Sequence, residues 1–306
     1  MNTRHAKMIL AILREGSFTA AAKALHITQP TLSQTVRQIE TQLGEAIFMR
    51  GKTPVQLTRA GELYVQAARR IIQAETQLEE AISMLHGRAE GTLRIGITKH
   101  RSDELMPQII ADFFSAYPGV HLDIREGDAQ QLEQLLLEGE LDMAMYASEK
   151  QHSKLEYRLI ASEEVVLITG KRTRLAQRIP SGTTIGLREV EHERFVLPAP
   201  SNPHRALFDD LLSSCSITPD PCVLCGSIDA AMRICANSDL VGLVPFISLL
   251  CDSASMQKLA HYHLGTNAYL PPFYMVYAHE QPLAAHGETL FTLLSNRFRA
   301  MTAYRP

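Results

Sequence analysis

The sequence predicts a multidomain chain in which a small α+β unit is joined by a long helix to a larger α/β part. Three observations support this fold class. Runs with apolar residues three and four positions apart fill about the first 45 positions. A seven-residue apolar repeat then extends from about 58 to 86. Beyond residue 90, strand-like and helix-like runs alternate, as in a mostly parallel sheet with helices on both faces.

Composition restricts the class of protein. The 306 residues, 45% hydrophobic and 21% charged, suffice for two or more domains with cores. No run approaches about eighteen apolar residues and the N-terminus lacks a signal peptide's apolar stretch, so we expect a cytoplasmic protein without a membrane partner.

The charge is unevenly distributed along the chain. Residues 1–70 hold ten Lys and Arg against four Asp and Glu, whereas the remainder holds 20 against 29. A basic module attached to an acidic one suits binding to a polyanion.

Three short helices are expected in the N-terminal unit. The first spans 4–15, and the second is the alanine-rich stretch 20–25. His26 and Ile27 make a tight turn into the third, 28–43, which Thr28 caps and Gly44 ends. A tight turn between the second and third of three helices is typical of the helix-turn-helix, whose third helix enters the major groove.

The third helix has two distinct faces. Its apolar stripe consists of Leu32, Val36, Ile39 and Leu43. A second face carries Gln29, Ser33 and Arg37, with Gln34 and Gln38 beside them. Amide, hydroxyl and guanidinium groups are the side chains that hydrogen-bond base edges and phosphates. Taken alone, the stretch could equally be an ordinary surface helix.

A short hairpin is expected after Gly44. Two β-like pieces, 47–49 and 55–57, flank a turn at 51–54, and the arrangement is similar to a wing. Arg50 and Lys52 would lie at its tip, where basic side chains neutralise phosphates.

A long helix is expected from Thr58 to about His86. Tyr64, Ile71, Leu78 and Leu85 are seven apart, and Ala67, Ala74 and Ala81 fill a second series. Large and small residues alternating in heptads form a seam for a partner helix, so we expect a homodimer through this helix. The alternative is a helix packed against its own chain. The stretch 87–91 reads as a linker.

The remainder is expected to form two α/β units. The first has strands at about 93–98, 121–126 and 143–146 with helices at 103–117 and 129–138; the second has strands at 165–169, 195–198, 222–226 and 240–245 with helices at 204–214 and 229–237. A strand at 273–278 and a closing helix at 283–302 return to the first unit. Open α/β sheets bind ligands at the carboxyl ends of strands, so a crevice between the units is the expected pocket.

The segment 16–62 resembles the DNA-binding end of the LysR-type transcriptional regulators. The matching positions are Ser17, Phe18, Ala21, Ala22, Leu25, Gln29, Pro30, Leu32, Ser33, Ile39, Leu43, Gly44, Phe48, Arg50, Leu57, Thr58 and Gly61. The resemblance, weaker beyond residue 65, implies a winged helix-turn-helix over 1–60, a linker and dimerisation helix over 61–88 and an effector domain over 89–306. The effector domain would resemble periplasmic binding proteins, with subdomain I at 89–163 and 268–306 and subdomain II at 164–267.

The resemblance also implies partners and contacts. It implies a regulator, not an enzyme, that works without a cofactor as a homotetramer on a double-stranded DNA operator, with RNA polymerase open as a further partner. The DNA contacts would be Gln29, Pro30, Thr31, Ser33, Gln34 and Arg37, with Arg50 and Lys52 in the wing. Thr53 and Pro54 stand where the family often has a basic residue, so the wing contacts are the weaker expectation.

A small anionic metabolite is the expected effector. A helix opens after the first strand with the residues Thr98, Lys99, His100, Arg101 and Ser102. Backbone N–H groups at such a helix start favour an anion. The basic side chains would strengthen this preference if they turn inward; otherwise they are solvated surface. The resemblance adds to the cleft Gly127, Asp128, Pro200, Ser201, Asn202, Pro203, Gly226, Ser227, Pro245 and Phe246.

Other signals are weaker. Cys222 and Cys225 are spaced like half of a metal or redox motif, but no second pair stands nearby, and strand geometry turns their sulfurs to opposite faces. We therefore predict no metal site, and a cysteine-based redox or metal-responsive regulator on the same scaffold stays an alternative. His261 with His263, and the run 191–193, lack a third ligand. No catalytic motif is present, although a small-molecule binding protein or enzyme without DNA binding is a further alternative.

Overall fold

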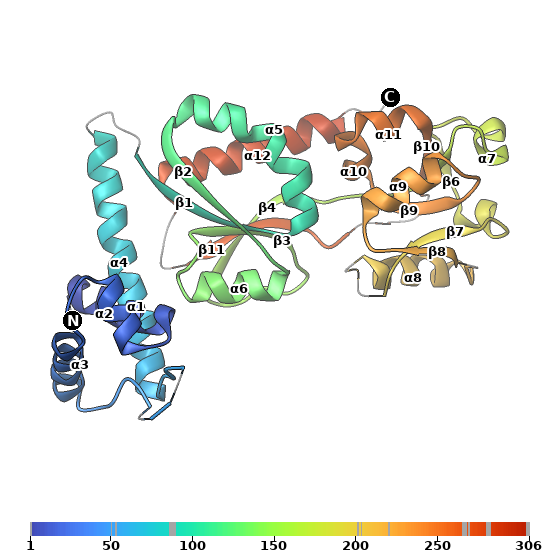
Figure 1. Cartoon of the computed structure of the whole chain (residues 1–306). Coiled ribbons are helices and arrows are strands. Elements are labelled where there is room, and N and C mark those ends of the chain that lie inside the picture. The colour runs from blue at the N-terminus through green and yellow to red at the C-terminus, as the bar shows by residue number, and fades with distance from the viewer. Residues whose placement is uncertain are drawn as a thin grey trace.

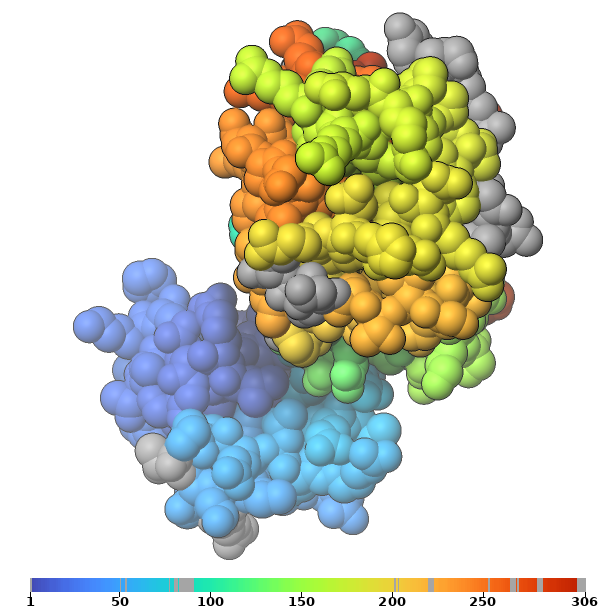
Figure 2. Space-filling view, turned by 90° about the vertical axis from the view of Figure 1, so that its right-hand side faces the viewer, coloured from blue at the N-terminus to red at the C-terminus, as the bar shows by residue number. Residues whose placement is uncertain are grey.

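The computed structural model describes residues 2–49, 51–52, 54–85, 90–200, 202, 204–219, 221–264, 268, 270–279 and 283–303. It has a helical head, a long helix α4 (Arg59–Leu85) and two α/β units built on separate sheets (Figure 1). This architecture confirms the predicted fold class. Viewed from the side of the second sheet, the head lies below and to one side of the α/β units (Figure 2).

The head contains α1 (Thr3–Glu15), α2 (Phe18–Ala24) and α3 (Gln29–Leu43). Local sequence explains each boundary. The N-cap side chains of Asn2, Ser17 and Thr28 accept hydrogen bonds from backbone N–H groups of the first turns. Gly16 and Gly44 end α1 and α3 with positive φ, a conformation that glycine adopts without strain. The head core includes Ile9, Ile12 and Leu32, all fully buried.

Helix α4 changes its surroundings along its length. Near its start, Tyr64, Val65 and Ala68 pack into the core of the head, and Tyr64 is only 8% exposed. Further along, Leu78 is 61% exposed. The heptad interpretation is therefore wrong for Tyr64, because the residue packs within its own head. The side chains of Ala81 and Leu85 lie outside the described part of the chain.

The first sheet has the strand order β2-β1-β3-β11-β4. Its strands are β1 (Glu90–Ile97), β2 (Gly119–Glu126), β3 (Met143–Ala147), β4 (Leu155–Ala161) and β11 (Phe273–Ala278). Helices α5 (Lys99–Ala116) and α12 (Ala285–Ala303) contribute to one core cluster, while α6 (Ala129–Leu137) contributes to a second. The sheet is thus covered on both faces, as expected.

The second sheet has the order β6-β10-β5-β9-β7-β8. Its strands are β5 (Val165–Gly170), β6 (Thr184–Ile185), β7 (Phe195–Pro198), β8 (Pro221–Cys225), β9 (Val241–Pro245) and β10 (Leu259–Leu264). Its helical elements are α7 (Arg174–Arg178), a 3-10 turn at Leu187–Val190, α8 (Arg205–Ser214), α9 (Ile228–Ala236), α10 (Phe246–Cys251) and α11 (Ser253–Lys258). None of the described helices has the length and apolar content needed to cross a bilayer.

The structure differs from the sequence prediction in several respects, of which three concern the arrangement of the sheets and of α5. Strand β4 was not expected, because its alternation is blurred by residues such as Arg158 and Leu159. Helix α5 begins at Lys99, four residues before the expected start. Both sheets are mixed: β11 runs antiparallel to β3 and β4, and β5 runs antiparallel to β9 and β10. Strand direction depends on where the chain crosses between the units, which apolar periodicity does not encode.

Candidate DNA-binding surface and effector cleft

The polar face of α3 points away from the head. Leu32, Val36 and Ile39 are buried beneath it, whereas the predicted contact residues Gln29, Pro30, Thr31, Gln34 and Arg37 are exposed and Ser33 is half-buried. Leu43, expected to complete the apolar stripe, is instead 44% exposed.

The polar side chains of this face bond mainly to one another. Gln29 Nε2 donates to Ser33 Oγ at 2.9 Å, and the hydroxyl oxygens of Thr28 and Thr31 lie 2.8 Å apart. Within the described part of the chain, the side chains of Gln34 and Arg37 have no hydrogen-bond or ion-pair partner. Their donors are available to an external acceptor, which is what a base- or phosphate-reading helix requires.

The wing lies beside α2 as a minimal hairpin. Phe48 and Leu57 form an antiparallel bridge, and the Met49 N–H donates to the Gln56 carbonyl oxygen at 2.8 Å. Phe48 packs edge-on against Phe18, with ring centroids 5.5 Å apart. Lys52 is exposed, whereas the predicted contact Arg50 and the neighbouring Thr53 lie outside the described residues.

A glycine fixes the approach of α4 to the wing. A Cβ atom on Gly61 would lie 2.1 Å from the carbonyl oxygen of Ile47. Backbone cannot yield to such a contact cheaply, so only glycine lets α4 pass this close to the strand. A side chain at this position would therefore force α4 away from Ile47.

The basic run that opens α5 is largely paired within the protein. Lys99 Nζ lies 3.4 Å from Glu126 and 3.9 Å from Asp103 on the exposed surface. His100 Nε2 lies 3.0 Å from Ser248 Oγ on α10 and 3.1 Å from Glu104. Thr98 is the N-cap but makes no side-chain capping bond, and Ser102 N–H donates to the Thr98 carbonyl oxygen.

Arg101 turns into the protein and not toward the cleft. Its buried guanidinium pairs with Glu104 and Glu163 and lies over the Phe273 ring. Burial alone would raise the pKa of Glu104, but the hydrogen bond from His100 and the Arg101 charge outweigh it and lower this pKa to about 2. Burial raises the pKa of Glu163. The Arg101 charge is thus neutralised internally, so the condition under which it would strengthen an anion site is not met.

The second unit places beside His100 a residue that the sequence did not indicate. His204 directly precedes α8; its ring centroid lies 6.2 Å from that of His100, and the ring stacks on Phe208. Burial lowers the pKa of His204 to about 4, so its ring is neutral at physiological pH. The only available signal was its position next to the predicted Pro203.

The other predicted cleft residues occupy turns that the fold itself needs. Asn202 Nδ2 donates to the Gly226 carbonyl oxygen at 3.3 Å, which joins two predicted loops of the second unit. Ser227 caps α9, and Asp128, which follows Gly127, caps α6 in a capping box. Pro245 precedes α10, whose first residue Phe246 is buried. Ser201 and Pro203 lie outside the described residues.

The described cysteine and histidine side chains of the weaker signals are buried or bonded within the protein, and the side chain of Cys222 lies outside the described residues. Burial raises the pKa of Cys225, and raises those of Cys235 and Cys251 to about 12, which keeps all three as thiols. His261 and His263 share a face, as expected, but bond to Ser181 and Glu164. Among the described residues, no group of three His, Cys, Asp or Glu could hold a metal ion.

Comparison with known proteins assigns the family. Residues 3–62 match the model of the bacterial regulatory helix-turn-helix protein, lysR family, and residues 86–299 match the LysR substrate binding domain. The chain is 29% identical over 227 residues to the HTH-type transcriptional regulator CfxR of Cupriavidus necator, covering 74% of this chain and 70% of that protein. It is 33% identical over 165 residues to a probable RuBisCO transcriptional regulator of Emiliania huxleyi, covering 53% and 52%.

Solved structures share the whole fold. A variant of full-length OxyR from Pseudomonas aeruginosa superposes with a TM-score of 0.72 at 21% identity, covering 100% of this chain and 97% of that one. Full-length CbnR in complex with its target DNA gives a TM-score of 0.57 at 20% identity, covering 97% and 99%. With both domain models matched in order, the chain belongs to the LysR family of DNA-binding transcriptional regulators.

Proposed function

We propose that α3 reads an operator in duplex DNA through Gln29, Pro30, Thr31, Ser33, Gln34 and Arg37, with Lys52 and Arg50 of the wing on phosphates. The observation that carries this proposal is the exposed polar face of α3, whose Gln34 and Arg37 side chains have no partner among the described residues. The solved CbnR complex with target DNA supports the same partner by analogy.

The proposed effector is a small anion bound between the two sheets. At the start of α5 the first-turn N–H groups have no intrahelical partner, and Thr98 provides no side-chain cap for them. The polar side chains of His204 and Ser248, from two other segments, lie next to His100 at this place. Burial raises the pKa values of Cys225, Cys235 and Cys251, so these three cysteines do not support the redox alternative.

The proposed assembly is a homodimer through α4, and a homotetramer when two dimers join. Leu63, Leu78 and Ile82 are 56%, 61% and 45% exposed on this helix. Exposed large apolar side chains on one helix are typical of a protein-protein contact. Effector in the cleft would change the spacing of the two heads and thereby operator binding, with RNA polymerase as the downstream partner.

Selection of DNA sites by the full-length chain tests this function. Gln29→Ala should retain DNA binding but relax the selected motif at one or two positions, because a bidentate amide contact is worth about 1–3 kcal/mol of base discrimination. Gln42→Ala, an exposed glutamine on another side of the same helix, serves as the control and should return the wild-type motif.

Two outcomes would contradict the proposal. One is selection in which Gln29→Ala returns the wild-type motif, which would show that the amide does not read a base. The other is a purified wild-type chain that fails to shift DNA even at low salt; the fold would then serve small-molecule binding without DNA.

A further inference from the structure

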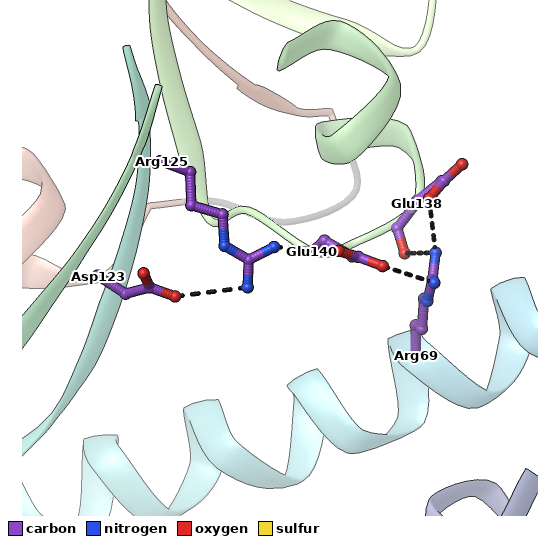
Figure 3. Close-up of polar contacts among 5 residues, drawn as sticks. All are labelled: Arg69, Asp123, Arg125, Glu138 and Glu140. Atoms are coloured by element: carbon purple, nitrogen blue, oxygen red, sulfur yellow. Dashed lines mark hydrogen bonds and ion pairs between the residues drawn. The ribbon is translucent and has the colours of Figure 1, made fainter. Parts of the chain in front are cut away.

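Helix α4 is docked onto the first sheet by a set of polar contacts. Arg69 lies 3.0 Å from Glu138 and 2.7 Å from Glu140, and Gln73 Nε2 donates to Asp142 at 3.3 Å. Figure 3 shows Arg69 reaching from α4 to the corner between α6 and β3, with Arg125 holding the other side of Glu140. Glu138, Glu140 and Asp142 stand at every second position of the chain, and the donors Arg69 and Gln73 lie one turn apart on α4. The spacing of the donors therefore matches the spacing of the acids.

The contact is close as well as polar. Gln73 is buried, and Gly139 packs against it with positive φ: a Cβ there would lie 3.4 Å from Gln73 Oε1. Burial raises the pKa of Asp142, although bonds from Arg94 and Gln73 oppose that shift. A single preferred docking of α4 on the first unit follows from these contacts.

A cavity of about 480 Å³ lies beside this docked helix. One wall is α4 with Gln66 and Arg70, another is the corner 136–139, and the third is the loop 152–154 with His279. We name this space the junction cavity. Its size is within the usual range for small-molecule sites. Because its walls come from both α4 and the first unit, it exists only while α4 is docked.

The charge of the junction cavity favours an anion. Among the described lining residues, Lys154 is a cation, Arg70 is a second cation that already has a contact within the protein, and Glu138 is the one carboxylate, which Arg69 neutralises. His152 Nδ1 accepts a hydrogen bond from the Lys154 N–H, which places the His152 ring proton on Nε2 as a further donor. Leu137 and Ala278 add apolar surface.

We propose that the junction cavity is a second ligand site, for a small organic anion bearing a carboxylate or phosphate, and that the bound anion holds α4 against the first sheet. Such a ligand binds the state with α4 docked more tightly than the state with α4 undocked. It therefore shifts the population toward docked α4 and toward the head position that goes with it. The site is separate from the effector cleft proposed above, and neither proposal depends on the other.

Calorimetric titration of the full-length chain with succinate and with inorganic phosphate, at constant ionic strength, tests the site. Neutral succinamide controls for charge. Lys154→Glu should weaken anion binding about tenfold or more by reversing a wall charge, and Ser153→Trp should weaken it by filling the space. Lys171→Glu, at an exposed lysine of the second unit, should bind as wild type does. Preference between the two anions identifies the acid group.

The coupling to α4 has its own readout in hydrogen exchange. Anion should increase the protection of residues 66–76 and of the corner 136–142 in the wild type. Arg69→Ala should reduce both this protection and the anion affinity, whereas Arg59→Ala, which removes only an exposed pair with Glu62, should change neither.

Three results would overturn the inference: no saturable binding of either anion, binding unchanged by both Lys154→Glu and Ser153→Trp, or binding without added protection of α4. In the second case the anion occupies another site, such as the cleft, and the proposed function stands. Failure of DNA site selection would instead remove the proposed function and leave the calorimetric result intact.

Discussion

Helices α3 and α5 both carry polar and basic side chains, but these side chains have opposite surroundings. Each follows a threonine N-cap and opens with polar or basic residues. On α3 those side chains are exposed and Arg37 has no partner among the described residues. On α5 the second and third residues, His100 and Arg101, are held by Ser248, Glu104 and Glu163.

The difference shows what decides whether a polar helix face can bind an external partner. The groups that neutralise Arg101 come partly from the same helix and partly from Glu163, 62 residues away. Among the described residues, no acid pairs with Arg37 on the outer face of α3. A polar helix face thus serves recognition only when the rest of the fold leaves its donors unpaired.

The largest expected effect follows from the buried group on α5. Arg101→Ala leaves Glu104 and Glu163 buried without their cation, and should lower the free energy of unfolding by about 3–5 kcal/mol. Urea unfolding of the full-length chain measures the change. Lys99→Ala, which breaks only exposed pairs, should stay within about 0.5 kcal/mol of wild type. Equal effects of the two variants would show that the Arg101 cluster is not a buried ionic group.

A smaller effect concerns pH. Burial lowers the pKa of His204 from 6.5 to about 4. Between pH 6.5 and 4, the His204 ring is therefore protonated in the unfolded chain but neutral in the folded protein. The contribution of His204 to the free energy of unfolding is therefore fully present above about pH 6.5 and is lost as the pH falls toward 4. The loss is about 2 kcal/mol, after allowance for partial exposure of the ring.

His204→Gln tests this assignment. It should flatten the acid side of the stability curve between pH 6.5 and 4, whereas His192→Gln at a largely exposed ring should leave the curve unchanged. An unaltered curve for His204→Gln would show that the ring is exposed to solvent and not packed between His100 and Phe208.

The features of the fold that depend on local sequence could be predicted, and those that depend on distant contacts could not. Helices α1, α2 and α3, their caps and the outer face of α3 follow from contiguous residues, since capping and 3.6-residue periodicity are local. Contacts between segments distant in sequence could not be predicted in this way. They include the pairing of Arg101 with Glu163, the proximity of His204 to His100 and the docking of Arg69 on Glu138. Strand β4 and the antiparallel pairing of β11 depend on tertiary packing in the same way.

The most direct test of the central claim, that the outer face of α3 contacts DNA, is the salt dependence of operator binding by Arg37→Ala. The slope of log K against log salt should fall by about one unit, since one phosphate contact is lost, and affinity should fall for all sequences alike. Arg178→Ala, an exposed arginine of the second unit, should keep the wild-type slope. An unchanged slope and affinity for Arg37→Ala would contradict the account, because the most available cation of α3 would then not face the DNA.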